Sequence, residues 1–178
     1  MWGLLPRIAD PSKLQMLFTG SYEHTIDAKN RLAIPSAIRS ELDPETDGTR
    51  FYVLPGRRPG TLAIYPARQF DRLGERRPAE PIPDEDELTY DQITFSMASP
   101  PLEPDKQGRI LLPEKPLRMA GIGKQVVVIG VRNHLELWNK SDYDRFLAEN
   151  WARYSEIQLR ARRAMQQGGQ DSRSTNAH

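Results

Sequence analysis

The chain has 178 residues, of which 38% are hydrophobic and 28% are charged; this is the composition of a soluble protein with one domain or two small ones. Cysteine is absent, which excludes disulfides and thiolate metal sites, and no apolar run approaches the roughly 18 residues of a membrane span. The net charge of +1 and the pI of about 8.0 exclude a uniformly basic nucleic-acid-binding protein, so any such surface must be a local cluster.

Residues 1–16 are assigned to an N-terminal extension. The first residues of the chain lack the continuous apolar core of a secretory signal. A first module is predicted over residues 17–74. Its most informative motif starts with Asp27-Ala28-Lys29-Asn30, which is typical of a hairpin turn. Aspartate accepts hydrogen bonds from nearby backbone N–H groups, and asparagine is second only to glycine in adopting positive φ.

A strand, a short helix and two further strands are predicted to follow this turn. Leu32 and Ile34 alternate with more exposed positions, as in a half-buried strand, and Pro35 ends that strand and suits the start of a short helix. The apolar runs 51–54 and 62–65 are predicted to be a buried strand and its hairpin partner.

Residues 75–89 are interpreted as an acidic, proline-rich linker, since three prolines precede four consecutive acidic residues. A second module is predicted over residues 90–147, and residues 90–97 are expected to be its opening strand. The chain is therefore predicted to consist of two β-rich modules joined by a polar connection.

The two modules repeat the same motifs in the same order. Asp105–Pro113 matches Asp27–Pro35 in its pattern of aspartate, three residues, arginine, three largely apolar residues and proline, and Gly108 takes the place of Asn30. Three later blocks also match: 51–56 with 126–130, 62–65 with 135–138, and 69–73 with 142–146. Chance rarely preserves such an order, so a tandem repeat of one unit is predicted.

After the second module, apolar and aromatic residues recur at three- and four-residue steps from Tyr143 to Ala161, which predicts one long helix. Its part beyond the module is assigned to residues 148–167. Its aromatic side chains are expected to pack in a core or between subunits. Residues 168–178 are interpreted as a disordered tail.

The motifs at Gly20–Pro35 and Asp105–Pro113, with the Gly130–Trp138 segment, resemble the MraZ family of the SpoVT-AbrB superfamily. The resemblance implies a mainly β fold with short helices (α+β), in which two swapped-hairpin modules form a pseudo-symmetric β-barrel, plus a long C-terminal helix. It also implies a homo-oligomeric ring in the cytoplasm and nucleoid. Such a ring would bind short repeats in double-stranded DNA upstream of the division and cell-wall gene cluster, usually as a repressor, with no cofactor or small-molecule substrate.

Four basic residues are the candidate DNA-binding set: Lys29, Arg31, Lys106 and Arg109. The resemblance implies that the two arginines face DNA, and the lysines suit insertion of the hairpin into a groove. Four other residues are expected to hold the turns: Asp27, Asn30, Asp105 and Gly108. The arginines have a structural alternative, in which each bonds the aspartate of its own hairpin.

Three other functions compete with this interpretation. An enzyme is disfavoured, because the histidines at 24, 134 and 178 are scattered and no phosphate loop or nucleophile motif is present. An antitoxin-like protein-interaction module is disfavoured by the presence of two modules rather than one. A degenerate ring that has lost DNA binding is a third alternative, because Asn30 stands where the family has glycine.

Overall fold

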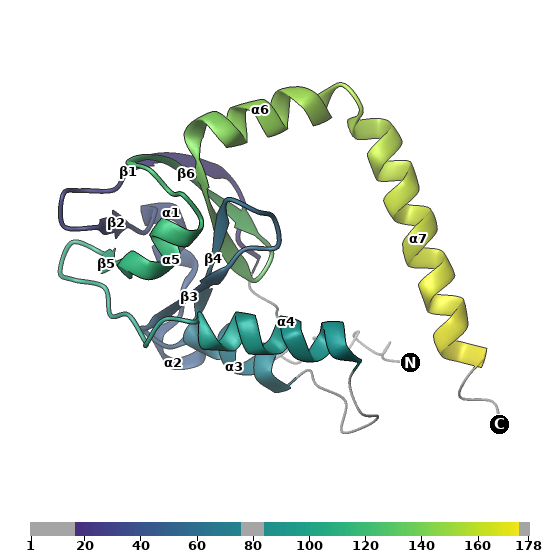
Figure 1. Cartoon of the computed structure of the whole chain (residues 1–178), viewed down its shortest axis with the longest axis horizontal. Helices are drawn as coiled ribbons and strands as arrows, with labels where there is room; N and C mark the ends of the chain where they lie inside the picture. Colours follow the sequence, from purple (N-terminus) through teal and green to yellow (C-terminus); the bar gives the residue numbers. More distant parts are fainter. Residues whose placement is uncertain (1–16, 76–83, 175–178) are drawn as a thin grey trace, which may run out of the picture. The chain divides into compact units, whose positions relative to one another are not determined.

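The computed structural model describes residues 17–75 and 84–174. Its elements, in chain order, are β1 (Ser21–Thr25), β2 (Arg31–Ala33), α1 (Ser36–Glu41), α2 (Pro44–Asp47), β3 (Phe51–Pro55), β4 (Thr61–Pro66), α3 (Ala67–Glu75), α4 (Glu85–Ser96), β5 (Arg109–Leu111), α5 (Glu114–Met119), β6 (Gln125–Val131), β7 (His134–Asn139), α6 (Lys140–Trp151) and α7 (Tyr154–Ser174). The chain divides into one compact unit that ends at Lys140 and a second that begins at Ser141. The fold is mixed α+β, as predicted (Figure 1).

The strands of the first unit form two antiparallel sheets that interleave the two modules. The larger sheet has the order β1-β6-β7-β4-β3, and the smaller one pairs β2 with β5. The pairing of β2 with β5 has the symmetry of the sequence repeat, in which Arg31 matches Arg109 and Ala33 matches Leu111. Arg31 lies opposite Leu111, and Ala33 lies opposite Arg109, so the two pairs are equivalent. The two modules are thus related by a local pseudo-twofold axis.

The opening segment of each module pairs with the other module. β1 of the first module pairs with β6 of the second, from Ser21 opposite Ile129 to Thr25 opposite Gln125. The corresponding segment of the second module forms a single bridge, in which Leu102 and Phe51 exchange backbone hydrogen bonds of 2.8 and 2.9 Å. Pro100 and Pro101 precede Leu102, and proline lacks the N–H that a longer ladder would need.

The prediction of an opening strand at residues 90–97 was wrong, because residues 90–96 lie in helix α4 and Met97 caps its C-terminal end. Asp84 caps the helix by accepting a hydrogen bond from the Glu87 N–H at 2.8 Å, and the acidic first turn complements the positive N-terminal end of the helix dipole. Part of the predicted linker, residues 85–89, therefore belongs to a helix. Residues 76–83, like residues 1–16 and 175–178, lie outside the described part of the chain.

A closed barrel is not formed by the strands of residues 17–75 and 84–174. β1 and β3 are the outer strands of the five-stranded sheet, and the β2–β5 ladder is separate from it. The prolines at 35 and 113 follow directly on Ile34 and Leu112, and they limit β2 and β5 to three residues each. The two sheets nevertheless share one core.

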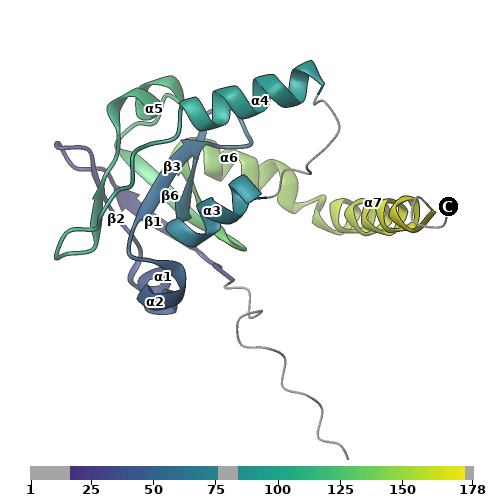
Figure 2. The same cartoon turned by 90° about the horizontal axis from the view of Figure 1, so that it is seen from below.

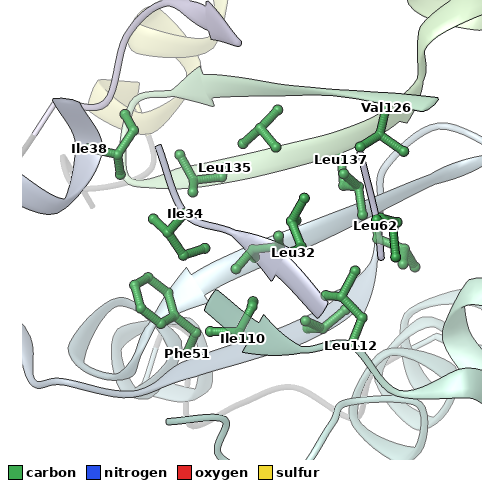
Figure 3. Packing of buried hydrophobic residues seen from close by; sticks show 14 of the residues in the cluster. Leu32, Ile34, Ile38, Phe51, Leu62, Ile110, Leu112, Val126, Leu135 and Leu137 are labelled. Carbon is green, nitrogen blue, oxygen red and sulfur yellow. The ribbon is translucent and has the colours of Figure 1, made fainter. Parts of the chain in front are cut away.

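The core lies between the β2–β5 ladder and one face of the larger sheet (Figure 3). The predicted inward alternation is confirmed: Leu32, Ile34, Ile110 and Leu112 are each at most 1% exposed. They pack with Leu62, Ile64, Leu135 and Leu137 of the central strands β4 and β7 and with further apolar residues of both modules. Because both modules contribute to this core, neither module buries its apolar face alone.

The second unit contains most of α6 and all of α7. The segment predicted to be one long helix forms two helices: α6 ends at Trp151, and α7 begins at Tyr154. The Asn150 side-chain amide donates to the Phe146 carbonyl at 2.7 Å, and such side-chain bonds compete with the helical backbone. Helix α7 continues to Ser174, through part of the segment predicted to be disordered. None of the helices in the described ranges is both long and apolar enough to span a membrane.

Candidate nucleic-acid interface

The turns that precede β2 and β5 are each organised by one aspartate carboxylate. They are not hairpin turns as predicted, because β1 pairs with β6 and β2 pairs with β5. In the first turn, Asp27 Oδ1 accepts hydrogen bonds from the backbone N–H groups of Lys29 (2.8 Å) and Arg31 (2.9 Å). In the second, Asp105 Oδ1 accepts from those of Gln107 (2.9 Å) and Arg109 (3.0 Å). This arrangement is the Asx turn that the aspartate-containing motif predicts.

The backbone closes both turns in the same way. The Asn30 N–H donates to the Asp27 carbonyl at 3.0 Å, and the Gly108 N–H donates to the Asp105 carbonyl at 2.8 Å. Asn30 has φ +57° and Gly108 has φ +73°, so both residues adopt the left-handed conformation that the sequence predicted for this position. Asparagine tolerates this conformation because its short polar side chain bonds locally.

The two arginines are held by the aspartates of their own turns. Arg31 Nε donates to Asp27 Oδ2 at 2.6 Å, and Arg109 Nε donates to Asp105 Oδ2 at 2.8 Å. The arginine–aspartate bonds that were the structural alternative are therefore present. These bonds do not engage every donor of the arginines, because a guanidinium has five N–H groups and the Arg31 and Arg109 side chains remain 33% and 28% exposed.

The β2–β5 ladder places both arginines on one surface. Residues opposite each other in a ladder point to the same face, as do alternate residues of one strand. Leu32 and Ile110 point into the core, so Arg31 and Arg109 share the outward face, two residues apart along the ladder. The turns that carry Lys29 and Lys106 project from the same side of the unit (Figures 1 and 2).

A lysine that the sequence analysis missed also contacts the first turn. Lys124 Nζ donates to the Asp27 carbonyl at 3.0 Å and to Asn30 Oδ1 at 3.3 Å. Its position follows from the exchange of β1 between modules, which brings the start of β6 next to the end of β1. No local sequence signal marks this residue, because the two segments are distant in the chain.

Helix α1 supports the second turn through Arg39. Its Nε donates to the Ile34 carbonyl at 3.2 Å, and its guanidinium lies over Gly108, where an added Cβ would be 2.6 Å from Arg39 Cζ. Glycine is thus favoured at position 108 both by the positive φ and by this contact.

Replacing Gly108 with alanine is therefore expected to lower the free energy of unfolding by about 1–3 kcal/mol, the cost of a strained backbone position. Urea unfolding measures this change. The matched control is Gly74→Ala, where an added Cβ meets nothing within 4 Å, and helix α3 should gain slightly from alanine. Equal effects of the two substitutions would contradict the role given to Gly108.

The turn carboxylates resist protonation. The side-chain hydrogen bond from Arg109, followed by the Arg109 backbone N–H, lowers the pKa of Asp105 to about 2, and the Arg31 backbone N–H is the largest cause that lowers the pKa of Asp27. A carboxyl whose folded pKa is depressed stabilises the fold above its unfolded pKa. That contribution is lost as the pH falls from the ordinary aspartate value of 3.8 toward 2.

Asp105→Asn should remove this part of the acid sensitivity. We expect the difference in unfolding free energy between the wild type and the variant to be constant near neutral pH and to shrink between pH 4 and pH 2. Urea unfolding of both proteins across this range measures it. A difference that stays constant through the window would show that the Asp105 carboxylate is not the titrating group.

Comparison with known proteins agrees with the repeat, because one family model matches two successive segments of the chain. The family model described as "MraZ protein, putative antitoxin-like" matches residues 17–92 and 97–166. The transcriptional regulator MraZ of Desulforamulus reducens is 33% identical over 141 residues, which cover 79% of this chain and 94% of that protein. That of Clostridium acetobutylicum is 34% identical over 140 residues, covering 79% and 88%, and that of Halothermothrix orenii is 34% identical over 141 residues, covering 79% and 94%. The chain belongs to the MraZ family.

Proposed function

We propose that this chain is a DNA-binding transcriptional regulator that contacts DNA through the β2–β5 ladder and its two turns. The observation that carries the proposal is the shared outward face of Arg31 and Arg109, flanked by the exposed Lys29 and Lys106. A two-stranded antiparallel ribbon fits the major groove of B-DNA. The names of the related proteins support the regulatory role.

The aspartate pairs suit this role, because they hold the arginines without engaging every N–H donor. Asp27 contacts Arg31 through Nε, whereas Asp105 contacts both Nε and Nη2 of Arg109, the latter at 2.7 Å. The remaining guanidinium N–H groups can donate to a guanine edge or a phosphate oxygen. Lys29 and Lys106 supply point charges for phosphates at the turn tips. Phosphate contacts provide affinity through counterion release, whereas base-edge contacts provide sequence choice.

A net charge of +1 is small for a monomeric DNA-binding protein, so the proposal includes a homo-oligomeric ring. Several copies would place weakly binding ladders on successive short repeats, and avidity would multiply their affinities. Two aromatic residues are candidates for contacts between copies. Trp151 and Tyr154 are 70% and 54% exposed, and their stacked rings have centroids 5.8 Å apart.

The family resemblance supports repression of the division and cell-wall gene cluster from the cytoplasm and nucleoid.

An antitoxin-like role is the second candidate, and the description of the matching family model favours it. An antitoxin would bind a protein partner and would need no ring. A stoichiometric partner protein that co-purifies with the chain, together with weak binding to all DNA, would favour this role. A ring that forms without any DNA affinity would instead indicate a member that has lost DNA binding.

Fluorescence anisotropy with the DNA upstream of this protein's own gene tests the proposal. A shuffled duplex is the control, and both titrations are repeated over a salt series. We expect the upstream DNA to bind much more tightly and its affinity to fall with salt, with a logarithmic slope of about 0.9 per phosphate neutralised. Equally weak binding of both duplexes would refute the proposed function.

A further inference from the structure

A small polar pocket lies on the face of the five-stranded sheet opposite the β2–β5 ladder. We propose that it binds a small tetrahedral oxyanion, namely inorganic phosphate or the phosphate group of a small monoester. Six residues line it: Arg57, Tyr65, Gln69, Arg72, Leu73 and Asn133. They come from the β3–β4 connection, β4, helix α3 and the β6–β7 turn.

The size of the pocket limits the ligand to a small ion. Its cavity volume is about 30 Å³, whereas pockets for drug-sized ligands measure about 300–1,000 Å³. A cavity needs a volume of roughly 10–15 Å³ to hold one water molecule. The cavity therefore accepts a water or one small ion, with any larger substituent of the ligand directed into solvent.

The polar groups of the pocket are donors suited to an oxyanion. Within residues 17–75 and 84–174, neither Arg57 nor Arg72 forms an ion pair or a side-chain hydrogen bond. The Gln69 side chain is only 2% exposed, and its Oε1 accepts from Asn133 Nδ2 at 3.4 Å. That contact leaves the amide N–H groups of Gln69 as donors, and none of the described residues that line the pocket is a carboxylate.

The second module provides an internal comparison. The repeat matches Gln69 with Asp142 and Arg72 with Arg145. In the second module these two side chains neutralise each other, because Arg145 Nη2 pairs with Asp142 Oδ1 at 2.5 Å. In the first module an amide replaces the carboxylate, so Arg72 keeps its charge for an external anion. Guanidinium groups bind phosphate oxygens through their planar fork.

The nearest carboxylate of the central strands is already engaged. Glu136 Oε2 accepts from Trp138 Nε1 at 3.0 Å, and Glu136 Oε1 lies 3.7 Å from His134 Nε2. The His134 ring in turn stacks on Tyr65, with 4.6 Å between centroids. Glu136 is therefore satisfied beside the pocket and does not supply the missing counter-charge.

The pocket is separate from the proposed DNA surface. Leu62 and Ile64 of β4 face the core beneath the β2–β5 ladder, whereas Ala63 and Tyr65 alternate to the other face and pack against helix α3. DNA bound to the ladder would lie on the opposite side of the sheet. The ligand is accordingly a free phosphate species rather than the DNA backbone.

Thermal unfolding of the full chain in sodium phosphate, with sodium chloride at matched ionic strength as the reference, tests the proposal. A ligand that binds only the folded state raises Tm with the logarithm of its concentration. We expect this rise in phosphate, and isothermal titration with inorganic phosphate should give a saturable site. Arg72→Gln should weaken that site roughly tenfold to a hundredfold, the effect of losing a charged hydrogen bond.

Two further variants make the test specific. Gln69→Asp restores the arrangement of the second module, and it should keep or raise Tm in chloride while abolishing the response to phosphate. Arg68→Gln changes an exposed arginine of α3 that does not line the pocket, and it should keep the response. An equal Tm rise in chloride, or a phosphate response that survives both Arg72→Gln and Gln69→Asp, would overturn the proposal.

Duplex DNA binding distinguishes the two sources of phosphate. The affinity of Arg72→Gln for duplex DNA and its salt slope should equal those of the wild type. If the substitution lowers both while free phosphate leaves Tm of the wild type unchanged, the pocket contacts the DNA backbone and the small-ion assignment is wrong.

Discussion

Replacing Arg31 and Arg109 together with alanine is expected to abolish the preference of this protein for its own upstream DNA. Each guanine contact by arginine contributes about 1–3 kcal/mol of discrimination, so the double variant should lose roughly tenfold or more in specific affinity. Both arginines lie on the outward face of one ladder, and their loss removes the guanidinium donors that would contact base edges. Anisotropy titrations with native and shuffled duplexes measure the change.

The lysines of the same turns provide the contrasting variant. Lys29→Ala with Lys106→Ala should weaken binding to both duplexes alike. The slope of the logarithm of affinity against the logarithm of salt concentration should fall by about 0.9 for each phosphate contact that is lost. Arg68→Gln, on the other face of the sheet, is the control for loss of one positive charge. Thermal unfolding verifies that each variant is folded, since removing Arg31 or Arg109 also leaves Asp27 or Asp105 unpaired. Unchanged specificity in a folded Arg31/Arg109 double variant would refute the assigned surface.

Ile110→Ala is expected to cost about 2–5 kcal/mol of unfolding free energy, the range for removing a large buried aliphatic side chain. Ile110 is 0% exposed and lies opposite Leu32, which is equally buried. The truncation would open a cavity between the two sheets, where both modules meet. Urea or thermal unfolding measures the loss, and the whole first unit should unfold in one transition because it has one shared core.

Leu111→Ala is the matched control, because the neighbouring side chain points outward and is 59% exposed. It should change the unfolding free energy by less than about 0.5 kcal/mol, as surface substitutions usually do. Similar losses at positions 110 and 111 would contradict the alternation on which the placement of Arg109 also depends.

Much of the local structure could be predicted from the sequence. The aspartate, the left-handed residue and the arginine of each turn are within five residues of one another, so their hydrogen bonds depend on few distant contacts. The alternation of Leu32, Ile34, Ile110 and Leu112 correctly identified the buried face, because side chains on a strand have a strict period of two. The repeat likewise indicated two equivalent modules before any contact between them was known.

Two predictions of secondary structure were wrong for physical reasons: the strand at residues 90–97 and the single long helix after Tyr143. Residues 90–97 contain apolar residues that suit a strand, but the Asp84 cap and the acidic first turn favour a helix. The aromatic periodicity after Tyr143 continues through Trp151 and Tyr154, but it carries no information about the bond from the Asn150 side chain to Phe146. In both cases the structure contains a side-chain hydrogen bond, made by Asp84 or by Asn150, that the hydrophobic pattern does not predict.

The sequence by itself determined the tandem modules, the Asp-based turns and the inward side of each short strand, since these depend on propensity and periodicity within a few residues. Only the tertiary structure decided the exchange of β1 between modules, the contact of Lys124 with the first turn, and the common outward face of Arg31 and Arg109. It also decided the pocket beside Arg72, which joins residues from four separate elements. Such juxtapositions arise because the two modules bury their apolar faces against each other, and this pairing of distant segments has no signature in either module alone.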